Sequence, residues 1–195
     1  MKKHILTLLL ALVLCMGLCV PASAAATPFT DVPAGSPFEE AIAFAVEVGI
    51  AKGTSATTFS PNNPCTVSHI LTFLMRSLGG GSQDAAAERE DVRKMAVSMR
   101  DNYGVPIDPE NLNAVCTRLT AVRIFAALSN TYNEEYDAKS AQKFTDLPDD
   151  KASRIAVAMA VDFGITKGTS ETAFSPDNPC TRGQIITFIY RSVTS

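Results

Sequence analysis

One segment of about 50 residues is written twice in this 195-residue chain. Residues 29–78 and 144–193 align without a gap and are identical at 27 of 50 positions, so we expect them to fold alike. Their most similar part is a polar loop, KGTSATTFSPNNPCT from Lys52 and KGTSETAFSPDNPCT from Lys167. A repeated unit that cannot bury its apolar faces alone must pack against its neighbours. The chain is therefore expected to fold by stacking repeats.

A weaker third copy lies between the two. It keeps an Ala/Val-rich helical pattern, a Gly-Val break at Gly104, the triplet Cys-Thr-Arg from Cys116 and a second apolar helix, but it lacks the Phe-x-Asp start. Its loop is also shorter than the loops of the other two copies. We predict one cooperative unit over 28–195, divided into repeat one 28–78, a linker 79–87, repeat two 88–130, a linker 131–143 and repeat three 144–195.

Each copy is predicted to form a helix, a loop and a second helix. In the first copy, Ser36 is expected to cap the first helix, with Pro37 at the first helical position and Glu39 completing a capping box. Apolar residues then recur at helical spacing along one face. Gly49 is placed to end this helix in the left-handed conformation that glycine adopts most readily.

The second helices have clear predicted starts. Thr66 is expected to open the helix of repeat one, and Thr181 with Gln184 to form a capping box in repeat three. Phe59 and Phe174 stand inside otherwise polar loops. We interpret these two rings as apolar plugs that fix each loop to the core.

The N-terminal 24 residues have the pattern of a secretory signal peptide. Lys2 and Lys3 precede an apolar run from Ile5 to Val20 and an Ala-Ser-Ala exit that ends at Ala24. This run is shorter than the roughly 20 residues of a membrane span. After cleavage, 15 basic and 20 acidic residues remain, which argues against nucleic acid or an anionic membrane surface as the partner.

Three cysteines remain after the predicted cleavage, and each precedes a threonine. Cys65, Cys116 and Cys180 therefore occupy one structural position in three copies. No Cys-x-x-Cys spacing typical of zinc sites is present in the sequence. We interpret them as small buried residues that close the loops onto the core; a disulfide or metal site is the alternative.

The order of these landmarks resembles the S-layer homology repeat. The landmarks are Phe-x-Asp-Val, an Ala-rich helix, Gly-Ile, Phe-x-Pro and Thr-Arg, and CTRGQIITFIYRS is similar to the version found in many Clostridia-type bacteria. The resemblance implies an all-α, pseudo-threefold module of three helix–loop–helix repeats. It also implies a non-catalytic function at the bacterial cell wall or cell surface. The module would attach an exported protein non-covalently to secondary cell-wall polysaccharide, often pyruvylated, in grooves between repeats.

The resemblance also implies which residues bind the glycan carboxylate. Arg118 and Arg182 match the family's Thr-Arg motif, in which the arginine contacts the ligand. A helix N-terminus offers amide groups and a partial positive charge, and an arginine there adds a two-pronged contact. The alternative for each arginine is a surface charge or an intramolecular salt bridge. The candidate ligand residues are Thr117, Arg118, Thr181 and Arg182.

The polar loop is expected to form a groove wall beside these arginines. The alternative is a plain connector whose hydroxyl groups satisfy its own backbone. Repeat one departs from the motif because Val67 replaces the arginine. His69, two residues on, is interpreted as an ordinary surface residue; the alternative is that it substitutes weakly for the arginine. The family's tryptophan is also missing; Pro37 and Phe38 stand near its place in repeat one. The candidate groove residues are Lys52, Gly53, Thr54, Lys167, Gly168 and Thr169.

Two other functions compete with wall binding. The chain is alternatively an exported interaction or scaffold protein that kept the fold and lost the glycan, with another exported protein as its partner. An enzyme is disfavoured because His69 is the only histidine left after the predicted cleavage and no nucleophile or metal motif is present. We therefore expect no catalysis, no metal and no cofactor.

Overall fold

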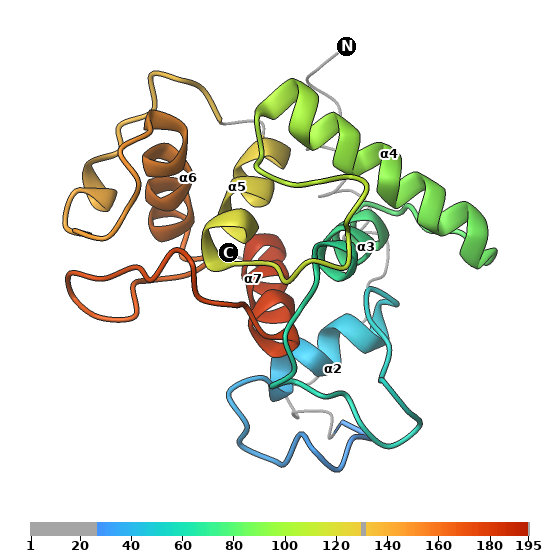
Figure 1. Cartoon of the computed structure of the whole chain (residues 1–195). Helices are drawn as coiled ribbons and strands as arrows, with labels where there is room; N and C mark the ends of the chain where they lie inside the picture. The colour runs from blue at the N-terminus through green and yellow to red at the C-terminus, as the bar shows by residue number, and fades with distance from the viewer. Residues whose placement is uncertain (1–26, 130–131, 195) are drawn as a thin grey trace.

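The computed structural model describes residues 27–129 and 132–194, and these form a helical protein (Figure 1). The predicted signal peptide lies outside the described residues. Within them the regular elements are helices, as predicted, and none is long and apolar enough to cross a membrane. The elements are α2 (Glu39–Glu47), α3 (Val67–Ser77), α4 (Ala85–Tyr103), α5 (Arg118–Leu128), the 3₁₀ helix η1 (Lys139–Ala141), α6 (Lys151–Asp162) and α7 (Arg182–Thr194).

The prediction for the start of α2 is wrong. This helix begins at Glu39, and Phe38 holds the cap position without a capping side chain. The hydroxyl of Ser36 accepts a hydrogen bond from the amide of Phe38 at 3.3 Å, and the carboxylate of Glu39 accepts one from the amide of Gly35 at 2.7 Å. Both side chains thus stabilise the turn ahead of the helix, because short polar groups bond to nearby backbone as readily in a turn as at a cap.

The other predicted helix ends are confirmed. Gly49 follows α2 with a φ of 77°, in the left-handed region. Thr66 caps α3, and its partner in the capping box is His69, whose ring nitrogen accepts from the Thr66 amide. Thr181 and Gln184 exchange the same pair of bonds at the start of α7. His69 is therefore exposed as expected, but it also stabilises a helix start.

The first turn of helix α4 lies in the segment assigned to the linker before repeat two. It begins at Ala85, inside the predicted linker 79–87, where the Asp84 carboxylate accepts from the amide of Ala86. Arg76 at the end of α3 forms a two-pronged ion pair with Glu88, with its Nε 2.8 Å from Oε1. This partly buried pair fixes the first turn of α4 to the preceding repeat.

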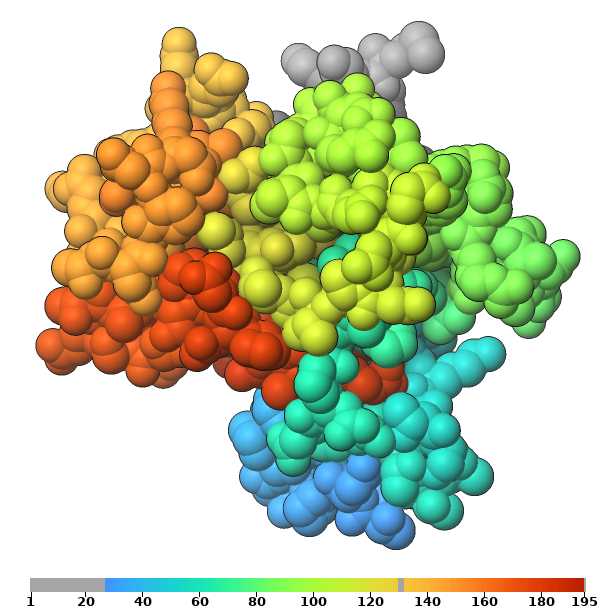
Figure 2. Space-filling view, viewed as in Figure 1, coloured from blue at the N-terminus to red at the C-terminus, as the bar shows by residue number. Residues whose placement is uncertain are grey.

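The helices pack in a cyclic order. Helix α2 packs on α7, α4 on α3 and α6 on α5, so the first helix of each pair contacts the second helix of another pair. The space-filling view shows the three pairs as separate sectors of one body, blue to cyan, green to yellow and orange to red (Figure 2). The buried faces of all six helices share one apolar core.

The three cysteines are joined by a closed ring of backbone hydrogen bonds. The amide of Cys116 donates to the carbonyl of Cys65 at 2.8 Å, that of Cys180 to Cys116 at 2.9 Å, and that of Cys65 to Cys180 at 2.8 Å. All three side chains are buried and unbridged, which confirms their interpretation as small buried residues. Burial raises the pKa of Cys65 and Cys180 to about 12, so both remain neutral thiols.

Candidate functional site

Each second helix begins against the loop of another repeat. At the start of α7, the amides of Arg182 and Gly183 donate to the carbonyls of Asn63 and Pro61 in the loop of repeat one, at 2.9 and 2.8 Å. The starts of α5 and α3 make the equivalent bonds. At the start of α5, the amides of Arg118 and Leu119 donate to the carbonyls of Asn178 and Pro176. At the start of α3, the amides of Val67 and Ser68 donate to the carbonyls of Ala114 and Leu112. We call these three contacts the junctions.

The junctions correct one expectation about the ligand site. The first-turn amides of α5 and α7 were expected to be open to a carboxylate, but loop carbonyls from another repeat occupy them. The amides of Thr120 and Gln184 are capped by the threonine hydroxyls of Thr117 and Thr181. A ligand at these helix tips must therefore be recognised by side chains, because the backbone donors already have partners.

Arg182 is buried in the junction between repeats three and one, with 7% of its surface exposed. Its Nε donates to the carbonyl of Phe59 at 3.2 Å and its Nη2 to the carbonyl of Lys52 at 3.1 Å. The guanidinium carbon lies 4.9 Å from the centre of the Phe59 ring and 5.4 Å from that of Phe73. The cation is thus held by two carbonyls and two ring faces.

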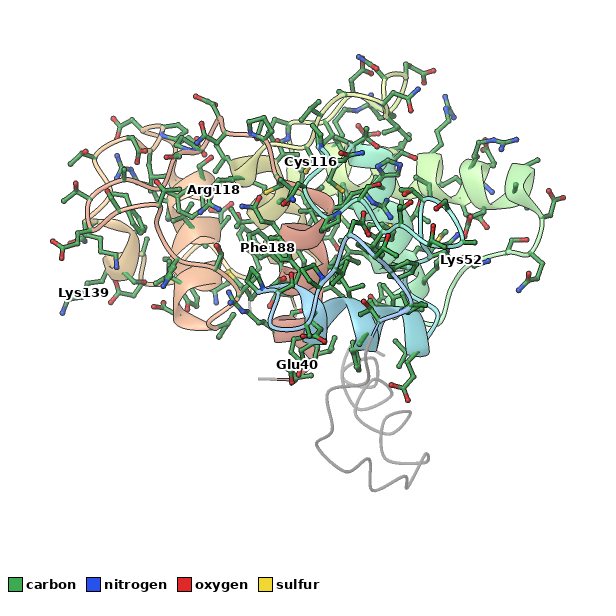
Figure 3. All side chains as sticks on the ribbon, turned by 90° about the horizontal axis from the view of Figure 1, so that it is seen from below. Glu40, Lys52, Cys116, Arg118, Lys139 and Phe188 are labelled. Atoms are coloured by element: carbon green, nitrogen blue, oxygen red, sulfur yellow. The ribbon has the colours of Figure 1, made fainter. Side chains whose placement is uncertain are left out.

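Arg118 repeats this arrangement in the junction between repeats two and three. Its Nε donates to Phe174 O at 2.9 Å, its Nη2 donates to Lys167 O at 2.8 Å, and its guanidinium carbon lies 4.7 Å from the Phe174 ring centre. In the view from below, Arg118 lies among the packed helices of the body (Figure 3). Burial lowers the pKa of both arginines, yet they start so basic that they stay charged at neutral pH. Within the described residues, the Nη1 atoms of Arg118 and Arg182 have no hydrogen-bond partner.

The third junction has neither the arginine nor the ring. Val67 is buried there with 5% of its surface exposed. The facing loop of repeat two has no phenylalanine, and it fills its core with Val105 and Ile107 instead. An arginine at position 67 would lack the aromatic face that holds the other two, so its loss accompanies the shortening of this loop.

The lysines and threonines of the polar loop lie at its surface. The side chains of Lys52 and Lys167 are exposed, whereas their carbonyls receive the two arginines. The hydroxyls of Thr54 and Thr169 each lie 2.7 Å from the serine hydroxyl six residues further on. These hydroxyls therefore bond within their own loop, as the connector interpretation expects.

The two loop glycines are required by close packing. A Cβ atom on Gly53 would lie 2.6 Å from the ring of Phe29, and one on Gly168 would overlap the ring of Phe144 in the same way. These rings pack against the buried Phe59 and Phe174 rings, which confirms the predicted plugs. Glycine at 53 and 168 thus admits the ring that fixes the loop.

A ring also occupies the α2–α7 contact. A Cβ on Gly183 would lie 2.8 Å from Cγ of Phe38, so the half-buried Phe38 ring packs directly on the α7 backbone. Phe38 stands near the place where the family carries a tryptophan. Its ring is used for packing between repeats one and three.

Sequence reasoning missed the role of two aspartates. Asp31 accepts from the amides of Phe59 and Ser60 at 2.8 and 2.7 Å, and Asp146 makes the same pair of bonds in repeat three. Ser60 has a φ of 59°, so the carboxylate fixes a strained residue just after the plug. The sequence feature that could have indicated this role is the Phe-x-Asp start shared by both copies. In each copy the aspartate lies 28 residues before the phenylalanine whose amide it binds.

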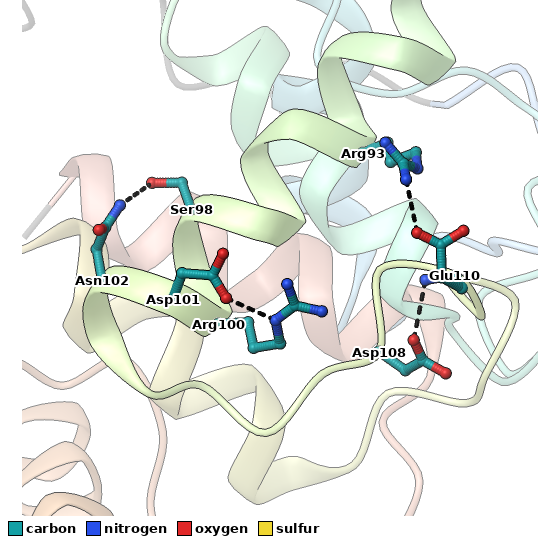
Figure 4. Close-up of polar contacts among 7 residues, drawn as sticks. All are labelled: Arg93, Ser98, Arg100, Asp101, Asn102, Asp108 and Glu110. Atoms are coloured by element: carbon teal, nitrogen blue, oxygen red, sulfur yellow. Dashed lines mark hydrogen bonds and ion pairs between the residues drawn. The ribbon is translucent and has the colours of Figure 1, made fainter.

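Repeat two carries a charged cluster where its loop passes α4 (Figure 4). Arg93 on α4 contacts Glu110 at 2.6 Å, and Asp108 accepts from the Glu110 amide at 2.9 Å. Arg100 pairs with Asp101 at 2.7 Å. These side chains are exposed, so their pairs add little stability. Arg93 and Arg100 of α4 are thus paired with neighbouring carboxylates.

The fold and the junctions define a helical repeat protein whose copies are locked by loops and arginines. The model of the S-layer homology domain matches residues 28–66 and 143–186. Both matched segments are therefore similar to the S-layer homology domain. The matched segments contain the two loops that receive the arginines. A search of curated proteins gave no match. These domains generally anchor proteins to cell-wall polysaccharide and occur in surface-associated proteins of the cell envelope.

Proposed function

We propose that this chain is a non-catalytic module that attaches non-covalently to a secondary cell-wall polysaccharide carrying acidic, pyruvate-type groups. The family match over repeats one and three is the observation that carries the proposal. In this proposal residues 1–24 direct export and the remainder acts at the cell wall. The mildly acidic net charge of the chain is compatible with this ligand, because a few well-placed cations can bind isolated acidic groups without a broad basic face.

The proposed architecture is a pseudo-threefold module made of the repeats 28–78, 88–130 and 144–195. The closed ring of cysteine amides and carbonyls supports it, as does the cyclic packing of the helix pairs. Repeat two is the divergent member. Both of its junctions keep the backbone hydrogen bonds. The junction between its loop and the start of α3 lacks the arginine and the phenylalanine ring.

We place the ligand carboxylate at the two junctions that keep an arginine. Nε and Nη2 of Arg118 and Arg182 each donate once to a loop carbonyl, so the two N–H groups of Nη1 and the second N–H of Nη2 remain for a ligand. The exposed amines of Lys167 and Lys52 supply a second cation on the same loops. Thr117 and Thr181 orient the helix tips. Gly53, Gly168, Thr54 and Thr169 shape the groove wall.

Binding to purified wall polysaccharide, with and without its pyruvate groups, tests this proposal. Changing Lys52→Ala or Lys167→Ala removes an exposed charge and leaves the buried arginines in place. Each change should weaken binding roughly fivefold, equivalent to about 1 kcal/mol per charge. Lys151→Ala is the matched control, because Lys151 is an exposed lysine at the start of α6. Calorimetry on the four proteins measures the difference.

The competing scaffold function has one observation in its favour. Both arginines are buried and bonded to loop carbonyls, so they would be needed even in a chain that binds no glycan. If the wild-type chain does not bind the polymer, or binds it equally without pyruvate, the proposed acidic-glycan site is wrong. Failure to bind any wall polymer would favour docking to another exported protein.

A further inference from the structure

The third junction, between the start of α3 and the loop of repeat two, has a histidine in its helix cap. The Nδ1 atom of His69 accepts from the amide of Thr66 at 3.3 Å, and the hydroxyl of Thr66 accepts from the amide of His69 at 3.3 Å. A ring nitrogen accepts a hydrogen bond only when it carries no proton, so the proton of the neutral ring lies on Nε2. The cap is therefore complete only while His69 is neutral.

The equivalent caps of the other two repeats do not titrate near neutral pH. In α7 the Oε1 atom of Gln184 accepts from the amide of Thr181 at 2.9 Å, and in α5 the hydroxyls of Thr117 and Thr120 lie 3.0 Å apart. Side-chain amides and hydroxyls keep the same protons throughout this pH range. Of the three caps, the one at α3 is thus the one that responds to pH.

A proton on His69 would place a positive charge where its surroundings oppose it. The ring stands at the N-terminus of α3, whose dipole disfavours cations, and the first turn of this helix has no acidic residue. From α7, the guanidinium carbon of Arg182 lies 5.4 Å from the centre of the Phe73 ring, and the Phe73 and His69 ring planes are 15° apart. Partial burial, followed by the charge of Arg182, lowers the pKa of His69 from its ordinary value of about 6.5.

The repeat-two side of the junction does not offset this effect. Residues 112–115, which meet the start of α3, carry no titratable side chain. Elsewhere in that loop, Asp108 accepts from the amide of Glu110, and Glu110 pairs with Arg93 of α4. Within the described residues, neither of these carboxylates raises the pKa of His69.

We propose that the third junction is an acid-sensitive latch between repeats one and two. Protonation of His69 removes the acceptor of the Thr66 amide and sets two N–H groups against each other, which releases the start of α3. The amides of Val67 and Ser68 then lose their carbonyl partners in the repeat-two loop. The other two junctions stay closed, because their arginines keep their charge at this pH. The proposal rests on the cap alone, so it does not depend on glycan binding.

His69→Gln is the matched variant, because Gln184 holds the same position in the cap of repeat three. A lowered pKa means that the folded state binds fewer protons than the unfolded chain. Stability is then full above about pH 6.5 and falls as the pH drops through the lowered pKa. Between pH 7.5 and 5.5, urea denaturation should show the ratio of folded to unfolded chain falling roughly threefold more in the wild type than in His69→Gln. An equal pH dependence of the two proteins would overturn the proposal.

Amide hydrogen exchange, corrected for intrinsic rates, locates the opening. Lowering the pH from 7.5 to 5.5 should reduce the protection of the Val67 and Ser68 amides in the wild type and leave it unchanged in His69→Gln. The amides of Arg182 and Gly183, which donate to the loop of repeat one, are the internal control and should stay protected in both proteins. An equal loss of protection at both junctions would show unfolding of the whole chain and would contradict a latch.

The ring signals of His69 supply a measurement on the wild type alone. In a labelled chain they are assigned through the backbone of residue 69, which separates them from those of His4. The ring should titrate with a pKa below 6.5, and below this value the Thr66 amide signal should shift as its hydrogen bond is lost. A His69 pKa of 6.5 or higher would overturn the proposal.

Discussion

Arginine is needed at positions 118 and 182 because of the shape of its side chain. In each junction, Nε and Nη2 reach two carbonyls about 50 residues or more away in sequence, while the flat guanidinium covers a phenylalanine ring. A lysine has one nitrogen and no planar face, so it would leave a buried carbonyl unsatisfied. Each arginine therefore combines a packing role with the proposed ligand contact.

Asp146 should make stability depend on pH. Burial acts to raise its pKa, but the amides of Phe174 and Ser175 and the charge of Arg118 lower it more, so the net shift is downward. Because the pKa of Asp146 is lower in the folded protein, its ionised carboxylate stabilises the fold at pH values above about 3.9, the ordinary pKa of an aspartate. This stabilisation is lost as the pH falls through the lowered pKa of the folded state.

We expect Asp146→Asn to reduce the free energy of unfolding by about 1 kcal/mol at pH 7, because one of two carboxylate oxygens can no longer accept an amide. The difference should shrink at acidic pH, where the wild-type carboxylate is protonated. Urea denaturation at several pH values measures it, with the exposed Asp177→Asn as control. Parallel pH profiles for wild type and Asp146→Asn would contradict the assigned role.

At the scale of elements, the loop of one repeat and the helix start of another form a matched pair. Two pairs keep the ring and the arginine, and the third has lost both, with Val67 facing the shortened loop. Because Val67 is buried, changing it to arginine should place a cation where no ring faces it.

Val67→Arg is therefore expected to lower the free energy of unfolding by about 2 kcal/mol or more. Val67→Ile keeps an apolar side chain and should cost less than about 1.5 kcal/mol. Thermal and urea unfolding of both variants test this. A Val67→Arg protein as stable as the wild type would show that the repeat-two loop can accept a guanidinium. The proposed matching of each loop to its helix start would then be wrong.

The local features of these elements could be predicted from sequence, and the distant ones could not. The cap at Thr181 was predictable because its partner Gln184 lies three residues away. Arg182 was identified as special, but the partners of its side chain lie 123 and 130 residues away, and nothing in the sequence indicates that they are carbonyls. The prediction for Ser36 was wrong because a serine hydroxyl can bond to the backbone of a turn as readily as to a helix start, and here it bonds in the turn.

The contacts of the segment before repeat three could not be predicted for the same reason. Tyr136 donates to Asp162 at the end of α6, 26 residues away. Ala141 in the same segment is buried against the core.

At the scale of the whole molecule, the junctions make each repeat depend on the other two. Because the cysteine ring closes through all three copies, removing one copy would leave unpaired backbone groups in both neighbours. We expect a single unfolding transition in urea, with helix content and tyrosine fluorescence changing together. Two separated transitions would show that the repeats are stable alone, contrary to the proposed module.

Cosedimentation with purified cell-wall sacculi tests the wall-binding claim most directly. The chain should pellet with intact sacculi and stay in solution once the non-peptidoglycan polymer has been extracted, because the proposed ligand is carried by that polymer. Added pyruvylated polymer should release the bound chain. Equal pelleting before and after extraction, or no pelleting with intact sacculi, would contradict the account.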